Sequence, residues 1–247
     1  MNRPRSLAFA AMLIVSLISS LAYGQRFRGR YTIEQNDPPA TEFIAARWHF
    51  GTNGLIGHMG WSHNYPYSEL HLNEFVAATT RIDVQSRSYR IVELGTDEVF
   101  DHPFTYVSEP GEMELTDQEV LNLREYINRG GFILIDDFDG PRHLAQLRSQ
   151  LWRAFPDRTL FPLTIEHPIF DLIFELQDLY GMAPYVPGGS LTYYGMLNDR
   201  GEIALVACHN NDLANFWDRI DQGSYPLRPS TDAFRMGINY LVYSMTH

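Results

Sequence analysis

The stretch that decides the fold is Gly-Gly-Phe-Ile-Leu-Ile-Asp-Asp-Phe-Asp-Gly, at residues 130–140. Gly130 offers the left-handed conformation in which helices commonly end. The apolar run 132–135 lacks the alternation of a half-exposed strand, which predicts a central strand covered by helices on both faces. Three aspartates follow where this strand should end. The stretch therefore predicts an α/β sheet with carboxylates at the end of a central strand.

The segment before this stretch carries agreeing helix signals. Thr116 is an expected N-cap, and Glu119 completes a capping box with it. Val120, Leu123 and Ile127 share one face at helical spacing. These residues predict a helix that begins after Thr116 and ends at Gly130.

Other segments extend the alternation of strands and helices. Strands are expected at 42–50, 89–94, 104–107, 159–163 and 202–208, and further helices at 68–79, 141–155 and from Ser230 onward. The remainder of 157–194 and the segment 209–228 show no clear pattern. Strands that alternate with helices predict a mostly parallel sheet with helices on both faces. We expect one α/β domain over residues 41–247.

The N-terminal residues have the pattern of a signal peptide. Arg3 and Arg5 precede an apolar run at 7–21, and Ala22-Tyr23-Gly24 forms a cleavage site before Gln25. This pattern predicts a signal peptide at 1–24 and export to the periplasm, with an uncleaved membrane anchor as the other interpretation. An exposed lead-in is expected over 25–40. After cleavage no stable membrane insertion is expected, because no later segment is long and apolar enough.

The composition restricts the chemistry and the partners. The formal net charge of −11 disfavours nucleic acid and anionic lipid as partners and favours an envelope protein or a small polar ligand. Every basic side chain is arginine, so Schiff-base chemistry and a Walker-type phosphate lysine are excluded. Cys208 is the only cysteine, so no intramolecular disulfide can form.

Several short motifs occur together in this chain. They are Tyr106-Val-Ser-Glu-Pro-Gly111, Leu123-Arg-Glu-Tyr126, Arg129-Gly-Gly-Phe132, Asp136-Asp-Phe138, Phe155-Pro-Asp157, His167-Pro-Ile-Phe170, Asn211-Asp212 and Gly237-Ile-Asn-Tyr240. In this combination the chain resembles, over roughly residues 40–247, the bacterial family called domain of unknown function 4159. The resemblance implies a class I glutamine amidotransferase-like, flavodoxin-like fold. It also implies export or membrane association, without a settled activity.

The chain departs from the amidotransferases at their catalytic position. Those enzymes need a cysteine on a sharp strand-to-helix turn, with a histidine and an acidic residue nearby. Here the comparable strand ends in Asp136 and Asp137, and Cys208 belongs to a different, apolar strand that predicts a buried thiol. The resemblance therefore does not extend to amidotransferase chemistry.

Polar side chains follow three expected strands at their carboxyl ends, where open α/β sheets bind ligands. The ligand-binding candidates are Glu109, Asp136, Asp137, Asn211 and Asp212. Oxygen ligands suit a divalent cation, and Asp136, Asp137 and His209 are the metal candidates. In the alternative interpretation, Asp137 or Asp139 caps the next helix and Asp136 bonds backbone amides in the turn.

Two functions are compatible with this edge. The first is an exported, non-catalytic binding or scaffolding module on an amidotransferase-like fold. The alternative is a metal-dependent hydrolase acting on a cell-envelope substrate, with Asp136 and Asp137 as ligands and His209 as base or ligand. A further alternative is a protein-interaction surface at 58–67 and 209–228. His58, His63 and His71 lack the spacing of a helical zinc site, so we expect them in a solvated loop.

Overall fold

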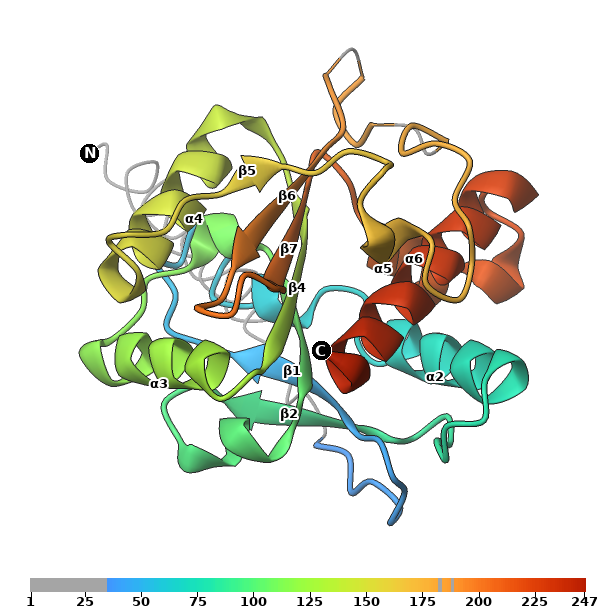
Figure 1. Cartoon of the computed structure of the whole chain (residues 1–247), viewed down its shortest axis with the longest axis horizontal. Helices are drawn as coiled ribbons and strands as arrows, with labels where there is room; N and C mark the ends of the chain where they lie inside the picture. Colours follow the sequence, from blue (N-terminus) through green and yellow to red (C-terminus); the bar gives the residue numbers. More distant parts are fainter. Residues whose placement is uncertain (1–34, 182–183, 188) are drawn as a thin grey trace, which may run out of the picture. The chain divides into compact units, whose positions relative to one another are not determined.

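A seven-stranded sheet in the order β2-β1-β3-β4-β7-β6-β5 forms the centre of the computed structural model (Figure 1). The structure describes residues 35–247 except 182, 183 and 188, so the signal peptide predicted at 1–24 lies outside the described residues. The strands are β1 Ala45–His49, β2 Tyr89–Glu93, β3 Phe104–Ser108, β4 Phe132–Phe138, β5 Phe161–Pro162, β6 Thr192–Leu197 and β7 Ile203–His209. Strands β2, β1, β3, β4 and β7 pair in parallel, whereas β6 and β5 pair antiparallel.

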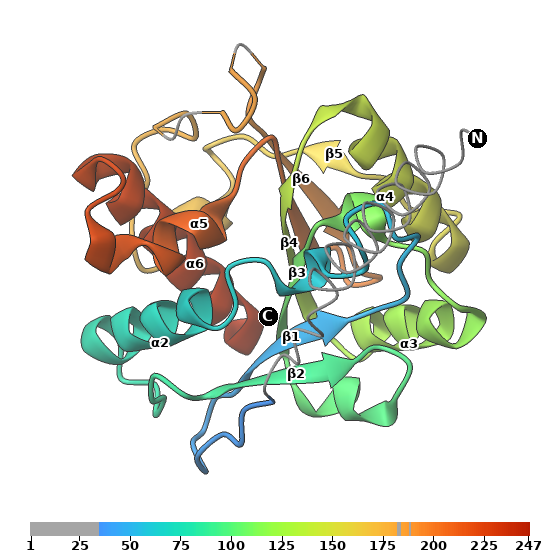
Figure 2. The ribbon, with the colours of Figure 1, turned by 180° about the vertical axis from the view of Figure 1, so that it is seen from behind.

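Helices cover both faces of the sheet. They are α2 Tyr67–Thr79, α3 Asp117–Asn128, α4 Gly140–Ala154, α5 Leu213–Asp218 and α6 Leu227–Thr246. Helices α2, α5 and α6 contact one another on one face, and α3 and α4 contact each other on the other (Figures 1 and 2). The prediction of an α/β fold with a mostly parallel sheet and helices on both faces is confirmed.

The central position of β4 follows from its sequence. All seven of its residues are buried, and Phe132 packs its ring against Phe104 and Tyr240. The helix before it begins as predicted, because Thr116 and Glu119 form a capping box. Gly130 has a φ of 98°, which confirms the left-handed position after that helix. Local signals and burial therefore agree along this part of the chain.

Three segments differ from the expectations. Residues 192–197 form β6, an antiparallel strand, and the segment 209–228, expected to be irregular, contains α5. Helix α6 begins at Leu227 rather than at Ser230, whose hydroxyl donates to the carbonyl of Pro226 at 3.0 Å within the helix. Pro229 lies in the first turn, where no intrahelical N–H partner is needed.

The described part of the lead-in is attached to the edge strand β2. Asn36 is buried, which departs from the expected exposure, and its amide donates to the carbonyls of Arg87 and Tyr89. Gln35 exchanges hydrogen bonds with both backbone groups of Ile91. These two side chains form hydrogen bonds with backbone groups of the edge strand β2 that would otherwise be unpaired. In the described residues, no helix is long and apolar enough to cross a membrane.

Candidate functional site

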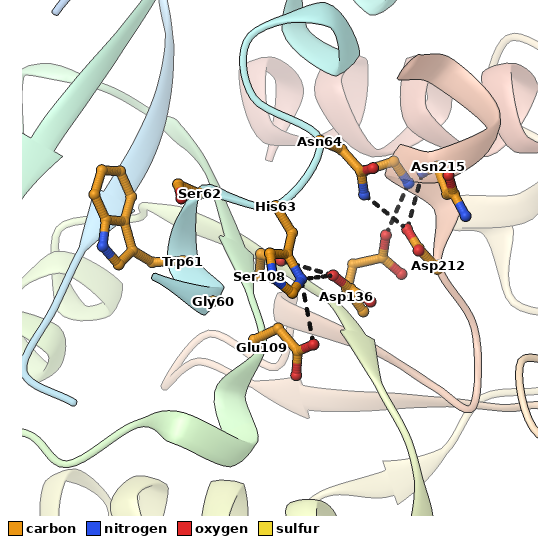
Figure 3. A network of polar contacts seen from close by, with 12 residues as sticks. Gly60, Trp61, Ser62, His63, Asn64, Ser108, Glu109, Asp136, Asp212 and Asn215 are labelled. Atoms are coloured by element: carbon orange, nitrogen blue, oxygen red, sulfur yellow. Dashed lines mark hydrogen bonds and ion pairs between the residues drawn. The ribbon is translucent and has the colours of Figure 1, made fainter. Parts of the chain in front are cut away.

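Three side chains converge where the strand order reverses between β1 and β3. His63 comes from the loop after β1 and Glu109 from the residue after β3 (Figure 3). Asp137 comes from the end of β4. One ligand atom from each of the three lies within 4.8 Å of the others. His63 Nδ1 is 3.1 Å from Asp137 Oδ2 and 3.3 Å from Glu109 Oε1. We call these three residues the triad.

The backbone turns left-handed where two triad residues leave their strands. Glu109 has a φ of 51° and Asp137 a φ of 60°, a region that side chains with a Cβ seldom adopt. The register between β4 and β7 shifts between Ile135 and Phe138, so Asp137 lies in a bulge. Bulges redirect side chains and are frequent beside functional sites. This bulge gives the consecutive aspartates different surroundings.

Asp137 is hydrogen-bonded from two other strand ends. Its Oδ2 accepts from Ser108 Oγ at 3.1 Å and lies at the same distance from His63 Nδ1. Hydrogen bonds to Asp137 and Glu109 raise the pKa of His63 to about 10. Burial raises the pKa of Glu109. The imidazolium therefore neutralises part of the negative charge at this edge.

Asp136 lies beneath the triad, fully buried. Its Oδ2 accepts from Tyr106 Oη at 3.1 Å and from the backbone N–H of Ala214 at 3.0 Å. Its Oδ1 is buried without a hydrogen-bond partner. Burial, and then the charge of Asp137, raise the pKa of Asp136 to about 7. The alternative interpretation was that Asp136 bonds backbone amides in the turn after its strand. Asp136 does accept from a backbone amide, but that amide belongs to Ala214 in α5.

Asn211 and Asp212 follow β7 and approach the same edge. Asp212 is the N-cap of α5, and its Oδ1 accepts from Asn215 N at 2.9 Å and from Asn64 Nδ2 at 3.2 Å. Burial, and then the charges of Asp137 and Asp136, raise the pKa of Asp212 well above its usual value. Asn211 donates to Tyr193 Oη at 2.7 Å and accepts from the backbone N–H of Asp212.

His209 and Asp139 have other surroundings. His209 Nε2 bonds the carbonyl of Gly140 at 3.1 Å, and its ring lies 5.2 Å from that of Phe138. Asp139 is the N-cap residue of α4 without a side-chain cap bond. Among the described residues, the acidic and histidine cluster contains Asp137 and Glu109 but neither Asp136 nor His209. The structure thus groups Asp137 with His63, a histidine that the sequence analysis had assigned to a solvated loop.

The loop that carries His63 is held by two buried charged residues. Glu112 accepts from the backbone N–H groups of Ile56, His58 and Gly60 at 2.8–3.0 Å. Arg47 donates to the carbonyls of Trp61 at 2.9 Å and His63 at 3.1 Å. The loop was expected to be solvated. One signal in the sequence could have placed it at the site: it follows β1 directly, and β1 pairs with β3, the strand that Glu109 follows.

Close contacts explain why residue 60 of this loop is a glycine. A Cβ at residue 60 would lie 2.8 Å from Glu109 Cβ and 2.8 Å from Glu112 Oε2, closer than real side chains approach. The Trp61 ring packs 4.5 Å from that of His49, so this aromatic attaches the loop to the domain. A glycine is required for the loop to approach the strand end.

The triad can coordinate a cation but provides no thiol nucleophile. One imidazole nitrogen and two carboxylates suit Zn²⁺ or Mn²⁺, and the oxygens alone also suit Mg²⁺ or Ca²⁺. Cys208 is fully buried, as predicted, and burial raises its pKa well above the ordinary value. A thiol in this state is not a nucleophile.

The comparison with known proteins identifies a family. No curated protein matches the chain. A family model described as a domain of unknown function matches residues 51–245, a range that includes His63, Glu109, Asp137 and Asp212. The chain therefore belongs to the domain of unknown function family DUF4159.

Proposed function

We propose that this protein is an exported, non-catalytic binding module that holds a divalent cation at His63, Glu109 and Asp137. The convergence of one imidazole nitrogen and two carboxylates within 4.8 Å supports this proposal. Three protein ligands leave coordination positions for oxygen atoms of a polar ligand or an envelope protein. The cation would connect the domain to that partner.

The charge at this edge favours a cation over an anion. Glu109, Asp136, Asp137 and Asp212 contribute carboxyl groups, and burial raises the pKa of three of them, Glu109, Asp136 and Asp212. The guanidinium of Arg47, which holds the loop, is buried and paired with Glu69. A bound cation would stabilise these carboxylates in their ionised form.

The fold supports a binding edge at this position. The parallel strands follow the order β2-β1-β3-β4-β7, which agrees with a flavodoxin-like or amidotransferase-like arrangement. Ligands of such sheets bind at the carboxyl ends of the strands, where the strand order reverses. The buried thiol of Cys208 supports a role without amidotransferase chemistry.

The N-terminal sequence supports export, and the acidic composition makes nucleic acid an unsuitable partner. N-terminal sequencing of the protein from the periplasmic fraction tests the first point. We expect the mature chain to begin at Gln25. Recovery of the chain only in the cytoplasm, with Met1 retained, would contradict export.

Metal binding tests the central proposal. Isothermal titration of the purified mature protein with Zn²⁺ and with Mn²⁺ should give one site. Asp137→Asn preserves shape and removes one ligand charge, so its affinity should fall by about ten- to a hundredfold. Asp139→Asn is the matched control, since Asp139 lies outside the triad, and it should bind as the wild type does. Equal binding by wild type and Asp137→Asn would refute the site.

The alternative function, a metal-dependent hydrolase, uses the same site. A test for product formation separates it from the binding function. The metal-loaded protein is incubated with isolated cell-envelope material, and released products are followed by mass spectrometry. The binding proposal expects no product above that of Asp137→Asn. Product released by wild type but not by Asp137→Asn would replace the binding role with metal-dependent hydrolysis.

A further inference from the structure

A pocket of about 280 Å³ is lined in part by Asp212, which is hydrogen-bonded to Asn64, the residue after His63 in the chain. Asp212, Asn215 and Phe216 contribute from the start of α5, Tyr185 from the segment before β6, and Tyr225 from the segment before α6. Asn211 and three proline side chains complete the wall. None of these residues belongs to the triad, so this pocket is distinct from the proposed cation site.

Two hydrogen-bond acceptors, the Asp212 carboxylate and Asn215 Oδ1, come from residues of this pocket near the start of α5. Asp212 is 8% exposed, and its carboxylate is held in place by the N–H of Asn215 and the amide of Asn64. Asn215 donates its own amide to Tyr225 Oη at 2.8 Å, and its Oδ1 is buried without a partner. A carboxylate and an unpaired amide oxygen need a ligand that brings donors.

The remaining wall is aromatic. The rings of Phe216 and Tyr225 lie 4.7 Å apart at 48°, and Tyr185 stands at the rim with 61% of its surface exposed. Aromatic faces attract cations, and they also cover alkyl chains. A carboxylate beside aromatic rings is a combination that suits an organic cation.

Tyr185 also lies in the electric field of the neighbouring acids. Burial, followed by the charges of Asp137, Asp212 and Glu109, raises the pKa of its hydroxyl. Its backbone is fixed, because Tyr185 N donates to Asn210 O at 3.0 Å and Val186 N donates to Asn210 Oδ1 at 2.8 Å. The backbone at the rim of the pocket is therefore held in place, and the rim lies close to negatively charged groups.

We propose that this pocket binds a primary alkylammonium group, with the ammonium between the Asp212 carboxylate and Asn215 Oδ1 and the alkyl chain along the aromatic wall. A free amine and the lysine-type side chain of a peptide share this chemistry. The two sources differ in what surrounds the amine, so both are used as probes below.

Isothermal titration in the presence of EDTA separates this pocket from the metal site. The probes are n-pentylamine, the equally long n-pentanol, and N-acetyl-lysine amide. The wild-type protein should bind the amine at least about tenfold more tightly than the alcohol, a difference of roughly 1.4 kcal/mol. Tight binding of the lysine derivative would indicate a peptide source, and binding of pentylamine alone would indicate a free amine. Equal affinity for pentylamine and pentanol would refute the proposal.

Variants locate the binding. Asp212→Asn keeps an efficient N-cap and should lose the preference for amine over alcohol. Tyr185→Ala removes an exposed ring and should weaken amine binding by about three- to tenfold. Tyr180→Ala is its control, because Tyr180 is 74% exposed and does not line the pocket. An unchanged preference in Asp212→Asn, or equal weakening by both tyrosine variants, would overturn the assignment.

Discussion

Asp136 and Asp137 are consecutive in β4, yet their carboxylates bond to different groups. Asp136 accepts from Tyr106 and the N-terminus of α5, whereas Asp137 bonds Ser108 and His63. The positive φ of Asp137 in a bulge produces this divergence. Both aspartates are buried, at 0% and 6% exposed, but only the carboxylate of Asp137 reaches His63.

The burial of Asp136 predicts how its carboxyl group makes the free energy of unfolding depend on pH. Its pKa is raised from 3.8 to about 7, by burial first and by Asp137 second. Between these values the unfolded chain has lost a proton that the folded chain keeps, so the stability of the wild type falls as pH rises and is constant above about 7. Asp136→Asn cannot ionise. Its stability relative to wild type should increase by an amount on the order of a few kcal/mol from about pH 4 to about pH 8.

Urea denaturation at several pH values measures this difference. Asp139→Asn is the control, since Asp139 is only partly buried at the start of α4. The difference between the two variants across the same window isolates the effect of burial at Asp136. Parallel stability curves for wild type and Asp136→Asn would show that Asp136 ionises as easily in the folded chain as in the unfolded one.

The sequence predicted most of the sheet because its signals are local. The apolar run of β4, the capping box of Thr116 and the glycine stop at Gly130 each involve neighbouring residues. The position of Glu109 and Asp137 at one edge also followed from the sequence, because parallel strands end on the same side. Helix α5 was missed because six residues are too few to show a helical repeat of apolar side chains. Strand β6 was missed because Gly195 interrupts its alternation of polar and apolar side chains.

The part of the site that the sequence did not predict depends on distant contacts. His63 reaches Asp137 only because Glu112 and Arg47 hold an irregular loop by its backbone groups. No spacing rule connects residues that far apart. The separation of Asp136 from Asp137 likewise depends on one left-handed residue, which strand alternation does not predict.

The protonation of His63 can be observed directly. Its pKa is raised to about 10 by hydrogen bonds to Asp137 and Glu109, so NMR of the metal-free protein should find the ring charged throughout the neutral range. A bound cation would displace this proton. Stabilisation by this charge is complete below about 6.5 and is lost as pH rises through about 10. Because the side chain is 41% exposed, the contribution should not exceed about 1 kcal/mol. Asp137→Asn should lower the measured pKa, and a His63 that titrates near 6.5 in the wild type would contradict the geometry.

Glu112 should determine the order of the glycine-rich loop. Glu112→Ala leaves the N–H groups of Ile56, His58 and Gly60 without their acceptor, so we expect a loss of roughly 2–4 kcal/mol in the free energy of unfolding. Glu112→Gln retains one carbonyl oxygen and should lie between wild type and Ala. Hydrogen exchange at these three amides measures the local effect. Glu114→Ala, at an exposed position, is the control and should leave their protection unchanged.

Arg47 has two roles that a pair of variants can separate. Arg47→Met leaves the buried carboxylate of Glu69 unpaired, which should cost about 3–5 kcal/mol. The double variant Arg47→Met/Glu69→Met removes that charge and should recover much of the stability. It cannot restore the donor to the carbonyls of Trp61 and His63, so Zn²⁺ affinity should stay below that of wild type. Urea denaturation and metal titration on the same samples measure the two effects. If stability and affinity recover together in the double variant, Arg47 does not position His63.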